Sequence, residues 1–458
     1  MQPELSAKRN IHLFKVDKQI QLSKRSKKTD EYDPVDADGI EIEDDKVVFS
    51  YEGEPLLTVL HKKQTLGVRR LEKDLFFYIA RFSTKSIKRK LGQLKIHTRS
   101  IEEAKTWLKY IQQWLWERDS ECEEGNTWKH FYILINPFSG VKKAMQTFKN
   151  LVEPVLWASN ITYEISVTKY SKHAEELIFK ADLTKYDAIM TLSGDGIINE
   201  VLNGLIKRKD VARAIRTPLA AINCGTGNSL VAEILHKRGE LSIENSTVNS
   251  LCAAIKGAPR ALYLLQYQTC CGTSLYGFLF IQWGLLADVE FDSSTLRILG
   301  SFRYKLYTLK HCLKNKVHYV KLRYRPPPSQ MIPTCYKDYL CRTNAFEALD
   351  PNLPDPSNYS NQDWIDIPNN DTTADDILYL MLIRPPITRV ELMKLFLKIG
   401  QDEYIMNEKV EIYCCQEVEI SPDVLACGPS SFMSVDGEEL PLQDLHITNG
   451  RKCAWVFN

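Results

Sequence analysis

The stretch SGDGIINEVLNGL at residues 193–205 decides how this chain of 458 residues is expected to fold. It follows an apolar run, Ala188–Leu192, that is typical of a buried strand, and it continues as a helical pattern to residue 208. Glycine at such a strand-to-helix turn lets backbone N–H groups approach a phosphate closely, and the helix N-terminus favours the negative charge. The turn therefore combines a phosphate-binding shape with an acid, Asp195, that stands between two glycines.

Strands and helices alternate on both sides of this stretch. Apolar runs typical of strands lie at 131–135, 161–167, 188–192 and 219–222, and helical patterns lie at about 142–157, 172–181 and 197–208. Such alternation predicts a parallel α/β sheet with helices covering its faces. Two more glycine-containing loops follow strands, NPFSG at 136–140 and CGTGN at 224–228. Because the carboxyl ends of parallel strands lie at one edge of a sheet, the three loops are expected to converge on one phosphate-binding crevice.

The turn at Asp195 does not match two common nucleotide-binding motifs. The sequence lacks the G-x-x-x-x-G-K-[ST] loop of P-loop NTPases, and Gly194 and Gly196 are followed by Asn199 where a G-x-G-x-x-G motif requires glycine. A carboxylate at this place can take the proton of an attacking hydroxyl or help to hold magnesium. The plainer alternative is that Asp195 only shapes the turn.

Composition limits the remaining classes of function. Hydrophobic residues make up 44% and charged residues 26%, and a net charge of +1 gives no overall attraction to nucleic acid. The first 25 residues are polar and lack the apolar core of a signal peptide, and the longest apolar stretch, Leu275–Val289, is too short and too polar to span a bilayer. The twelve cysteines are scattered, which favours reduced thiols. We therefore expect a cytoplasmic protein that meets membranes only peripherally.

The patterns divide the chain into four parts. Residues 1–45 are expected to form a mobile acidic leader, and 46–120 a β-rich domain closed by an amphipathic helix. Strands closed by such a helix resemble a pleckstrin-homology-like domain, and an unrelated small β-rich domain is the alternative. An α/β catalytic lobe is predicted at 128–257. A β-rich lobe is predicted at 258–458, with an irregular insertion rich in Pro and Asp at about 326–376.

Residues 193–205 resemble the signature of the diacylglycerol-kinase-type lipid kinases, and among them that of the sphingosine kinases. The similarity continues in WGLLADVE at 283–290, LRILGSFR at 296–303 and VDGE at 435–438. The segment 283–290 is more similar to sphingosine kinases than to ceramide or diacylglycerol kinases. The resemblance implies an N-terminal α/β lobe like those of phosphofructokinases and NAD kinases and a C-terminal β-sandwich lobe that binds the lipid. It also implies transfer of the ATP γ-phosphate to the primary hydroxyl of sphingosine, with Mg²⁺.

The resemblance also assigns roles to residues. Asp195 is similar to the family's general base. The positions that match lipid contacts are Ser193, Gly194, Asp195, Gly196, Asp288 and Glu290. The positions that match nucleotide contacts are Asn136, Pro137, Phe138, Thr168, Lys169, Tyr170, Ser171, Lys172, Glu200, Gly225, Thr226, Gly227, Arg297, Arg303, Asp436, Gly437 and Glu438. Asp195 and Asp436 match magnesium contacts, direct or through water, and the two arginines match cations that clamp phosphates.

Two positions depart from the family pattern. Glu290 stands where the family more often has Asp, so the carboxylate that would hold the amine and the secondary hydroxyl of the lipid lies one methylene further out. Asp288 is expected on the same strand face, where it can assist. The first loop has the sequence FSGV at 138–141 in place of a basic residue and further glycines, and Lys142 and Lys143 are candidate substitutes.

Several alternatives stay open at this point. The same fold also serves ceramide and diacylglycerol kinases, and a lipid-binding scaffold with impaired catalysis belongs to another class. The two arginines can instead form surface ion pairs, and a lysine or arginine of the protein can neutralise Glu290. The basic segment 302–316 is a candidate site for a membrane surface, calmodulin or another regulator, or simply a helix packed on its own lobe. A homodimer is a further candidate, and no nucleic-acid partner is expected.

Overall fold

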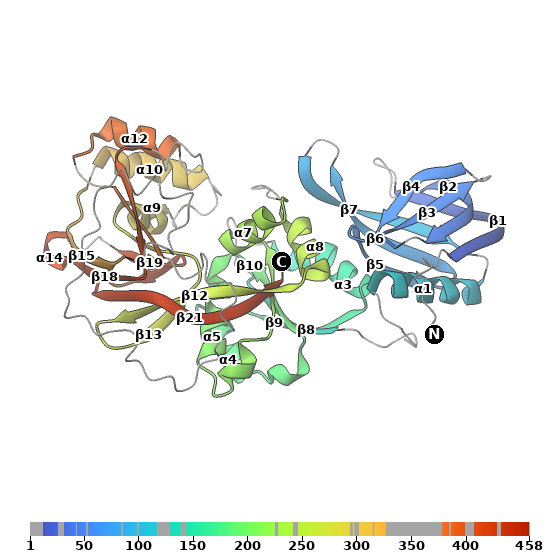
Figure 1. Cartoon of the computed structure of the whole chain (residues 1–458), viewed down its shortest axis with the longest axis horizontal. Coiled ribbons are helices and arrows are strands. Elements are labelled where there is room, and N and C mark those ends of the chain that lie inside the picture. Colours follow the sequence, from blue (N-terminus) through green and yellow to red (C-terminus); the bar gives the residue numbers. More distant parts are fainter. Residues whose placement is uncertain are drawn as a thin grey trace, which may run out of the picture.

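The structure of the protein is a computed structural model with a β-rich domain, an α/β lobe and a second β-rich lobe side by side (Figure 1). It describes residues 12–25, 32–42, 44–51, 54–83, 86–98, 100–116, 129–138, 143–224, 228–240, 246–293, 296, 302–314, 316–326, 378–383, 386–398, 407–427 and 432–457. The predicted insertion at about 326–376 lies, after its first residue, outside this set. In the described part of the chain, no helix has the length and apolar character that crossing a membrane requires.

The N-terminal domain consists of one seven-stranded antiparallel sheet with the order β4-β3-β2-β1-β7-β6-β5, followed by helix α1 (Ile101–Trp116). Its strands are β1 (His12–Arg25), β2 (Tyr32–Ile42), β3 (Lys46–Tyr51), β4 (Glu54–His61), β5 (Thr65–Leu71), β6 (Asp74–Ser83) and β7 (Ser86–His97). The mobile leader predicted at 1–45 is therefore wrong for β1 and β2. These strands pair with each other and with β3 and β7, so ladder hydrogen bonds order a segment whose charge suggested disorder.

Helix α1 covers the sheet with an apolar face, as its sequence pattern predicts. The backbone N–H of Glu103 donates to Ser100 Oγ at 3.1 Å, which caps the helix start. Trp107, Ile111 and Leu115 are buried in the same cluster as strands β5 and β6. Strands followed by one closing helix agree with the expected order of elements, and the pleckstrin-homology-like identity of the domain stays a prediction.

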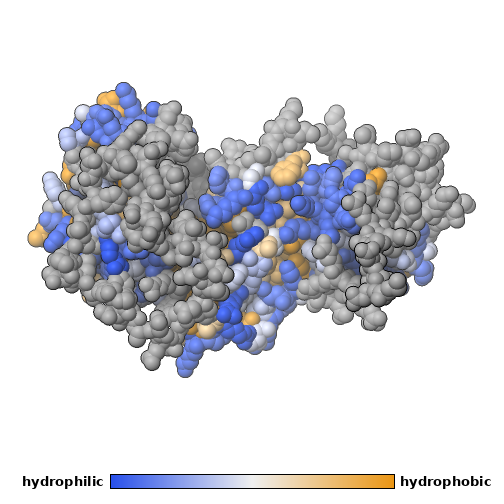
Figure 2. Space-filling view, viewed as in Figure 1, coloured by the Kyte–Doolittle hydropathy of each residue, from blue (hydrophilic) through white to orange (hydrophobic). Residues whose placement is uncertain are grey.

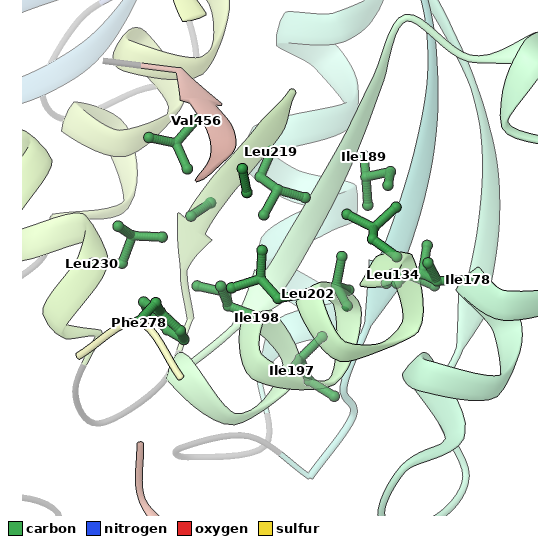
Figure 3. Close-up of a cluster of buried hydrophobic side chains, with 14 of the residues drawn as sticks. Leu134, Ile178, Ile189, Ile197, Ile198, Leu202, Leu219, Leu230, Phe278 and Val456 are labelled. Carbon is green, nitrogen blue, oxygen red and sulfur yellow. The ribbon is translucent and has the colours of Figure 1, made fainter. Parts of the chain in front are cut away.

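The α/β lobe contains the predicted parallel strands. They are β8 (Lys129–Ile135), β9 (Ile161–Val167), β10 (Ala188–Ser193) and β11 (Leu219–Asn223), and they lie in the order β11-β10-β8-β9. The helices are α2 (Ala144–Thr147), η1 (Phe148–Val152), α3 (Glu153–Ala158), α4 (His173–Lys180), η2 (Leu183–Lys185), α5 (Asp195–Ile206), α6 (Val211–Ala214), α7 (Ser229–Lys237) and α8 (Thr247–Lys256). Figure 3 shows Ile198 and Leu202 of α5 in the cluster that includes Leu134, Ile189 and Leu219 of the strands. This packing holds the start of α5 at the carboxyl end of β10.

The second lobe is β-rich but also carries helices, of which the sequence suggests only the one within 302–316. Its strands are β12 (Pro259–Thr269), β13 (Ser274–Gly277), β14 (Ile281–Trp283), β15 (Val320–Arg325), β16 (Leu378–Ile383), β17 (Val410–Cys415), β18 (Glu417–Pro422), β19 (Met433–Val435), β20 (Glu438–Leu440) and β21 (Leu445–Phe457). Its helices are α9 (Leu285–Ser293), α10 (Phe302–Lys314), α12 (Arg389–Leu397) and α14 (Val424–Cys427). The predicted architecture, an α/β lobe followed by a β-rich lobe, is confirmed.

Strand β21 joins the two lobes. It pairs antiparallel with β12 and β18 in the second lobe, and its end pairs parallel with β11 through Leu219 and Val456. The sheet of the α/β lobe therefore continues into the second lobe, in the order β13-β12-β21-β11-β10-β8-β9. This continuity gives the two lobes a fixed connection next to the ends of β10 and β11.

The N-terminal domain packs directly on the α/β lobe. Leu66 of β5 is fully buried in the same cluster as Phe131 of β8. Ser159 Oγ, just after α3, donates to the carbonyl oxygen of Leu66 at 2.8 Å. At Gly67 the backbones approach so closely that an added Cβ would lie 2.4 Å from the carbonyl carbon of Ala158. Glycine is therefore the residue that permits this contact.

The Gly67→Ala substitution is expected to destabilise the protein by about 1–3 kcal/mol, because a methyl group at this place forces the two backbones apart. Chemical denaturation of the purified variant measures the loss. Gly92→Ala is a matched control on β7, since its Cβ would meet only the carbonyl oxygen of Ile79 at 3.8 Å. Equal stability of the two variants would contradict the close packing at Gly67.

Candidate active site

Asp195 lies at the start of α5, and its carboxylate faces the start of another helix, α7. Its Oδ2 accepts from the N–H of Ser229 at 2.7 Å and its Oδ1 accepts from the N–H of Leu230 at 3.2 Å. Asn228 Oδ1 accepts from the N–H of Val231 at 2.8 Å and caps the same helix. Burial raises the pKa of Asp195 above the usual value, although the hydrogen bonds from Ser229 and Leu230 oppose this. The carboxylate is thus fixed in place, with acceptor capacity left for a ligand.

The carboxylate of Asp436, a predicted nucleotide and magnesium contact, accepts hydrogen bonds from the protein itself. Its Oδ1 accepts from the N–H groups of Leu279 and Phe280 at 3.0 and 3.1 Å. Its Oδ2 accepts from the N–H of Phe278 at 2.9 Å and from Asn199 Nδ2 at 2.8 Å. A carboxylate offers about four acceptor sites, and these bonds occupy them. Asp436 therefore ties the second lobe to α5, and it does not fit direct magnesium coordination.

Glu290 projects from helix α9, not from a strand as predicted. Its Oε2 accepts from Gln282 Nε2 at 2.7 Å and from Ser434 Oγ at 2.9 Å. Burial raises the pKa of Glu290, the hydrogen bond from Ser434 and the charge of Arg303 lower it, and the charge of Asp195 raises it. The two acids thus lie close enough for their charges to interact.

Asp288 points away from Glu290, so the predicted shared strand face is wrong. Two residues along an α-helix are separated by about 200° around its axis. Asp288 is buried, and its Oδ2 lies 3.3 Å from His318 Nε2. The long apolar run before Asp288 is typical of a strand as well as of a buried helix, which explains the wrong assignment.

The VDGE segment at 435–438 forms a turn that lies over the start of α5. Asp436 and Gly437 both have positive φ, 52° and 86°, which makes a tight turn between β19 and β20. A Cβ at Gly437 would lie 3.2 Å from Glu290 Oε1, and a Cβ at Gly196 would lie 2.8 Å from Glu438 Oε1. Glu290, Glu438 and the turn that carries Asp195 therefore meet at one place.

Arg303 supplies positive charge beside this acidic group. It lies near the start of α10 with its guanidinium over the ring of Tyr304, at 4.5 Å, and its NH2 donates to the Tyr304 hydroxyl at 2.6 Å. Its Nε and NH1 are buried and have no hydrogen-bond partner among the described residues. Donors of this kind suit a phosphate. Arg297 lies outside the described residues.

The predicted nucleotide segments follow β8 and β9 at the same edge of the sheet. Asn136 Oδ1 accepts from the N–H of Phe138 at 2.9 Å and shapes the turn through Pro137, and the Phe138 ring is 57% exposed. The N–H of Thr168 donates to the carbonyl of Ile135 at 2.9 Å, which joins the two segments. Beyond it lie Lys169, Tyr170, Ser171 and Lys172, before α4 begins. The loop Gly225-Thr226-Gly227 lies outside the described residues.

Glu200 of α5 holds the start of helix α4, next to the predicted nucleotide segment 168–172. Its Oε2 accepts from the N–H of Ala174 at 2.9 Å, at the start of α4. Burial raises its pKa, and hydrogen bonds from the backbone of Lys172, Ala174 and Glu175 oppose this. Lys172 itself is left-handed, with φ 66°. Glu200 therefore holds the end of the 168–172 segment in place. The direct contact of Glu200 with the nucleotide stays a prediction.

Other site residues escape the sequence analysis. Ser229 and Leu230 hold Asp195 through their backbone N–H groups, which carry no side-chain signature. Ser434 and Gln282 hold Glu290 from strands β19 and β14. Asn199 could be suspected from the sequence, because it closely follows the turn at Asp195. Its hydrogen bond to Asp436 could not be predicted, because the two residues are 237 positions apart in the sequence.

Parts of the chain are similar in sequence to known proteins. Residues 130–266 match the family model of the diacylglycerol kinase catalytic domain. Sphingosine kinase 1 of Arabidopsis thaliana is 33% identical over 201 residues, which cover 44% of this chain and 40% of that relative. Sphingosine kinase 1 of Homo sapiens is 28% identical over 302 residues, which cover 60% of this chain and 77% of that relative. A solved structure of a putative diacylglycerol kinase from Bacillus anthracis is 16% identical and covers 74% of this chain and 98% of that one, with a TM-score of 0.45. The chain therefore contains a region similar to the diacylglycerol kinase catalytic domain, and its curated relatives are sphingosine kinases.

Proposed function

We propose that the protein transfers the γ-phosphate of ATP to the primary hydroxyl of sphingosine or a closely related sphingoid base. The observation that carries this proposal is the proximity of two acids with different surroundings. Glu290 lies against the turn at Gly437, Glu438 of that turn lies against Gly196 beside Asp195, and the charge of Arg303 lowers the pKa of Glu290 while that of Asp195 raises it. A sphingoid base carries its amine and its primary hydroxyl on neighbouring carbons. One acid can therefore hold the ammonium group while the other receives the hydroxyl proton.

Asp195 fits the role of general base. Burial raises the pKa of its carboxyl, which makes the ionised form a better proton acceptor than an ordinary surface aspartate. The N–H groups of Ser229 and Leu230 fix its orientation. As the lipid hydroxyl oxygen bonds to the γ-phosphorus, the bond from that phosphorus to the ADP oxygen breaks and the hydroxyl proton passes to Asp195.

Glu290 fits recognition of the lipid headgroup. Its Oε2 accepts hydrogen bonds from Gln282 and Ser434, and its Oε1 faces the turn at Gly437. Burying a carboxylate without a nearby cation costs free energy. An ammonium group of the lipid supplies that cation, and the charge of Arg303 also favours the ionised carboxylate.

We assign the phosphate contact to Arg303 and the magnesium contacts to Asp195 and Glu438. Arg303 offers buried donors for a phosphate, and Arg297 stays a prediction. The described residues include no group of three or more His, Cys, Asp or Glu side chains placed to hold a metal by themselves. That agrees with Mg²⁺, which is usually held by one or two carboxylates together with the substrate phosphates. Asp195 and Glu438 fit this role, and the ion would neutralise charge on the phosphates.

The surface of the second lobe suits peripheral contact with a membrane. Helix α10 exposes Leu306, Leu309 and Leu313 by 44%, 44% and 52%, and Leu397 at the end of α12 is 80% exposed. Figure 2 shows orange atoms among blue ones at this corner, where α10 and α12 lie in Figure 1. Exposed apolar side chains beside lysines are typical of membrane-surface helices. A cytoplasmic protein that docks through this corner is our proposal, with calmodulin or another regulator as a competing occupant of 302–316.

Asp195→Asn is expected to abolish phosphorylation, since an amide accepts a proton far less readily than a carboxylate. Turnover is measured with labelled ATP and a panel of lipids, alongside ATP binding by titration calorimetry. ATP binding and the thermal unfolding midpoint are expected to stay near those of the unchanged protein. Full activity in this variant would refute the assignment of Asp195. Absence of ATP binding in the unchanged protein would favour a lipid-binding scaffold.

N-acylation of the substrate is expected to reduce kcat/KM by about 100-fold or more, because the amide no longer presents a cation to Glu290. Glu290→Gln should reduce kcat/KM for the free amine and leave the low activity on the acylated lipid unchanged. The comparison uses sphingosine and its N-acyl derivative in the same mixed micelles. Equal rates on the two lipids would favour a ceramide kinase, and preference for diacylglycerol would favour a diacylglycerol kinase.

A further inference from the structure

A buried ion pair joins the N-terminal domain to the α/β lobe. Arg89 of β7 donates from Nε to Glu240 Oε2 at 2.8 Å and from NH2 to Glu240 Oε1 at 2.7 Å. The two side chains are only 5% and 6% exposed. A paired guanidinium and carboxylate in this two-point arrangement fix direction as well as distance. The pair therefore sets the orientation of one domain against the other.

The surroundings of this pair restrain it further. Arg89 NH1 donates to the carbonyl of Ala80 at 2.9 Å, and its guanidinium lies 3.9 Å from the centre of the Phe82 ring. The backbone N–H of Arg89 donates to Asn249 Oδ1 at 3.0 Å, and Asn249 Nδ2 donates to Glu240 Oε2 at 3.2 Å. Asn249 belongs to α8, which packs on both α7 and β7. The pair is one part of a closed polar network between the two domains.

Glu240 lies directly after helix α7. Its backbone N–H donates to the carbonyl of Leu235 at 2.7 Å, and Gly239 before it has φ 66°. This is the hydrogen-bonded turn that commonly ends a helix, so Glu240 belongs structurally to the end of α7. The helix has nine residues, and Leu230, Val231, Ile234 and Leu235 are buried along its length. A helix of this length moves as one body of about 13 Å.

The other end of α7 holds the proposed general base. The N–H groups of Ser229 and Leu230 donate to the carboxylate of Asp195. One helix therefore has the interdomain ion pair at its end and the acid of the active site at its start. A shift of the end of α7 displaces the donors at its start by a similar amount, because the helix is rigid over this length.

We propose that Arg89 is a positioning residue for phosphoryl transfer, which fixes α7 and through α7 the carboxylate of Asp195. This inference rests on the proposed function of Asp195 as the base. The N-terminal domain is then a structural part of the catalytic unit, because it helps to position a catalytic group. A buried ion pair often adds little net stability compared with apolar residues of similar size. Its main contribution here is the fixed geometry of α7.

The test removes both charges of the Arg89–Glu240 pair. Arg238 NH2 also lies 3.6 Å from Glu240 Oε1, and the Arg238 side chain is 21% exposed, so water can reach it when Glu240 is replaced. In the Arg89→Met/Glu240→Met double variant both charges disappear, and Arg89→Lys keeps a charge but loses the two-point contact. Arg69→Met is the matched control. Arg69 also crosses the domain contact, donating from NH1 to the carbonyl of Trp157 at 2.9 Å and lying 4.4 Å from the centre of the Trp157 ring, and Trp157 belongs to α3. Thermal unfolding verifies that each variant is folded.

Two measurements report on the proposal. In both Arg89 variants we expect kcat to fall by about 10-fold with KM for ATP and lipid unchanged, because misplacement of a catalytic group reduces turnover more than binding. We also expect faster hydrogen exchange in the peptide Asn228–Leu235, and Arg69→Met should alter neither quantity. An unchanged kcat, or a lower kcat with unchanged exchange in this peptide, would overturn the proposal.

The exchange measurement separates this inference from the proposed function. If the unchanged protein phosphorylates no lipid, the proposed function fails, and exchange in Asn228–Leu235 still reports whether Arg89 holds α7. Faster exchange in the Arg89 variants then supports the mechanical link, and unchanged exchange contradicts it.

Discussion

The arrangement of the site depends on the buried carboxylate of Asp436. It receives three backbone N–H groups from the 278–280 segment and the side-chain amide of Asn199, so it joins the second lobe to the first turns of α5. Its own turn carries Gly437 against Glu290 and Glu438 against Gly196. Burial raises the pKa of Asp436, and the four donors oppose this by stabilising the ionised form. Together with strand β21, this joint fixes the separation between Glu290 of the second lobe and Asp195 of the α/β lobe.

Much of the α/β lobe could be predicted because its signals are local. Each parallel strand is a short apolar run, and each glycine loop follows one directly, so order and spacing reveal the sheet. Helix α9 could not be identified in this way, since an apolar run before an acid suits a strand equally well. Strands β1 and β2 were hidden by charge, because pairing with neighbours, and not composition, orders them. The joining role of β21 depends on contacts between distant segments of sequence.

In the site, too, features with a local sequence signal could be predicted, and features that depend on contacts between distant residues could not. The position of Asp195 in its turn was evident, and the structure places Glu290 and Glu438 near that turn. The functions of Glu200 and Asp436 were not evident, because an acid that binds backbone N–H groups looks the same in a sequence as one that faces a ligand. The donors from Ser229 and Leu230 were invisible for the complementary reason: every residue has a backbone amide, and only the fold decides which ones meet a carboxylate.

Strand β21 has a consequence for biosynthesis. Strand β11 obtains its neighbour on one side only when residue 456 is in place, more than 200 residues after β11 itself has been made. Until then the growing chain carries an open sheet edge, with apolar residues of β11 beside it, and such edges invite pairing with other chains. The N-terminal domain and the first parallel strands can form during synthesis, whereas completion of the sheet of the α/β lobe must wait until residue 456 has left the ribosome. Chaperone demand is therefore expected to be concentrated in this long interval.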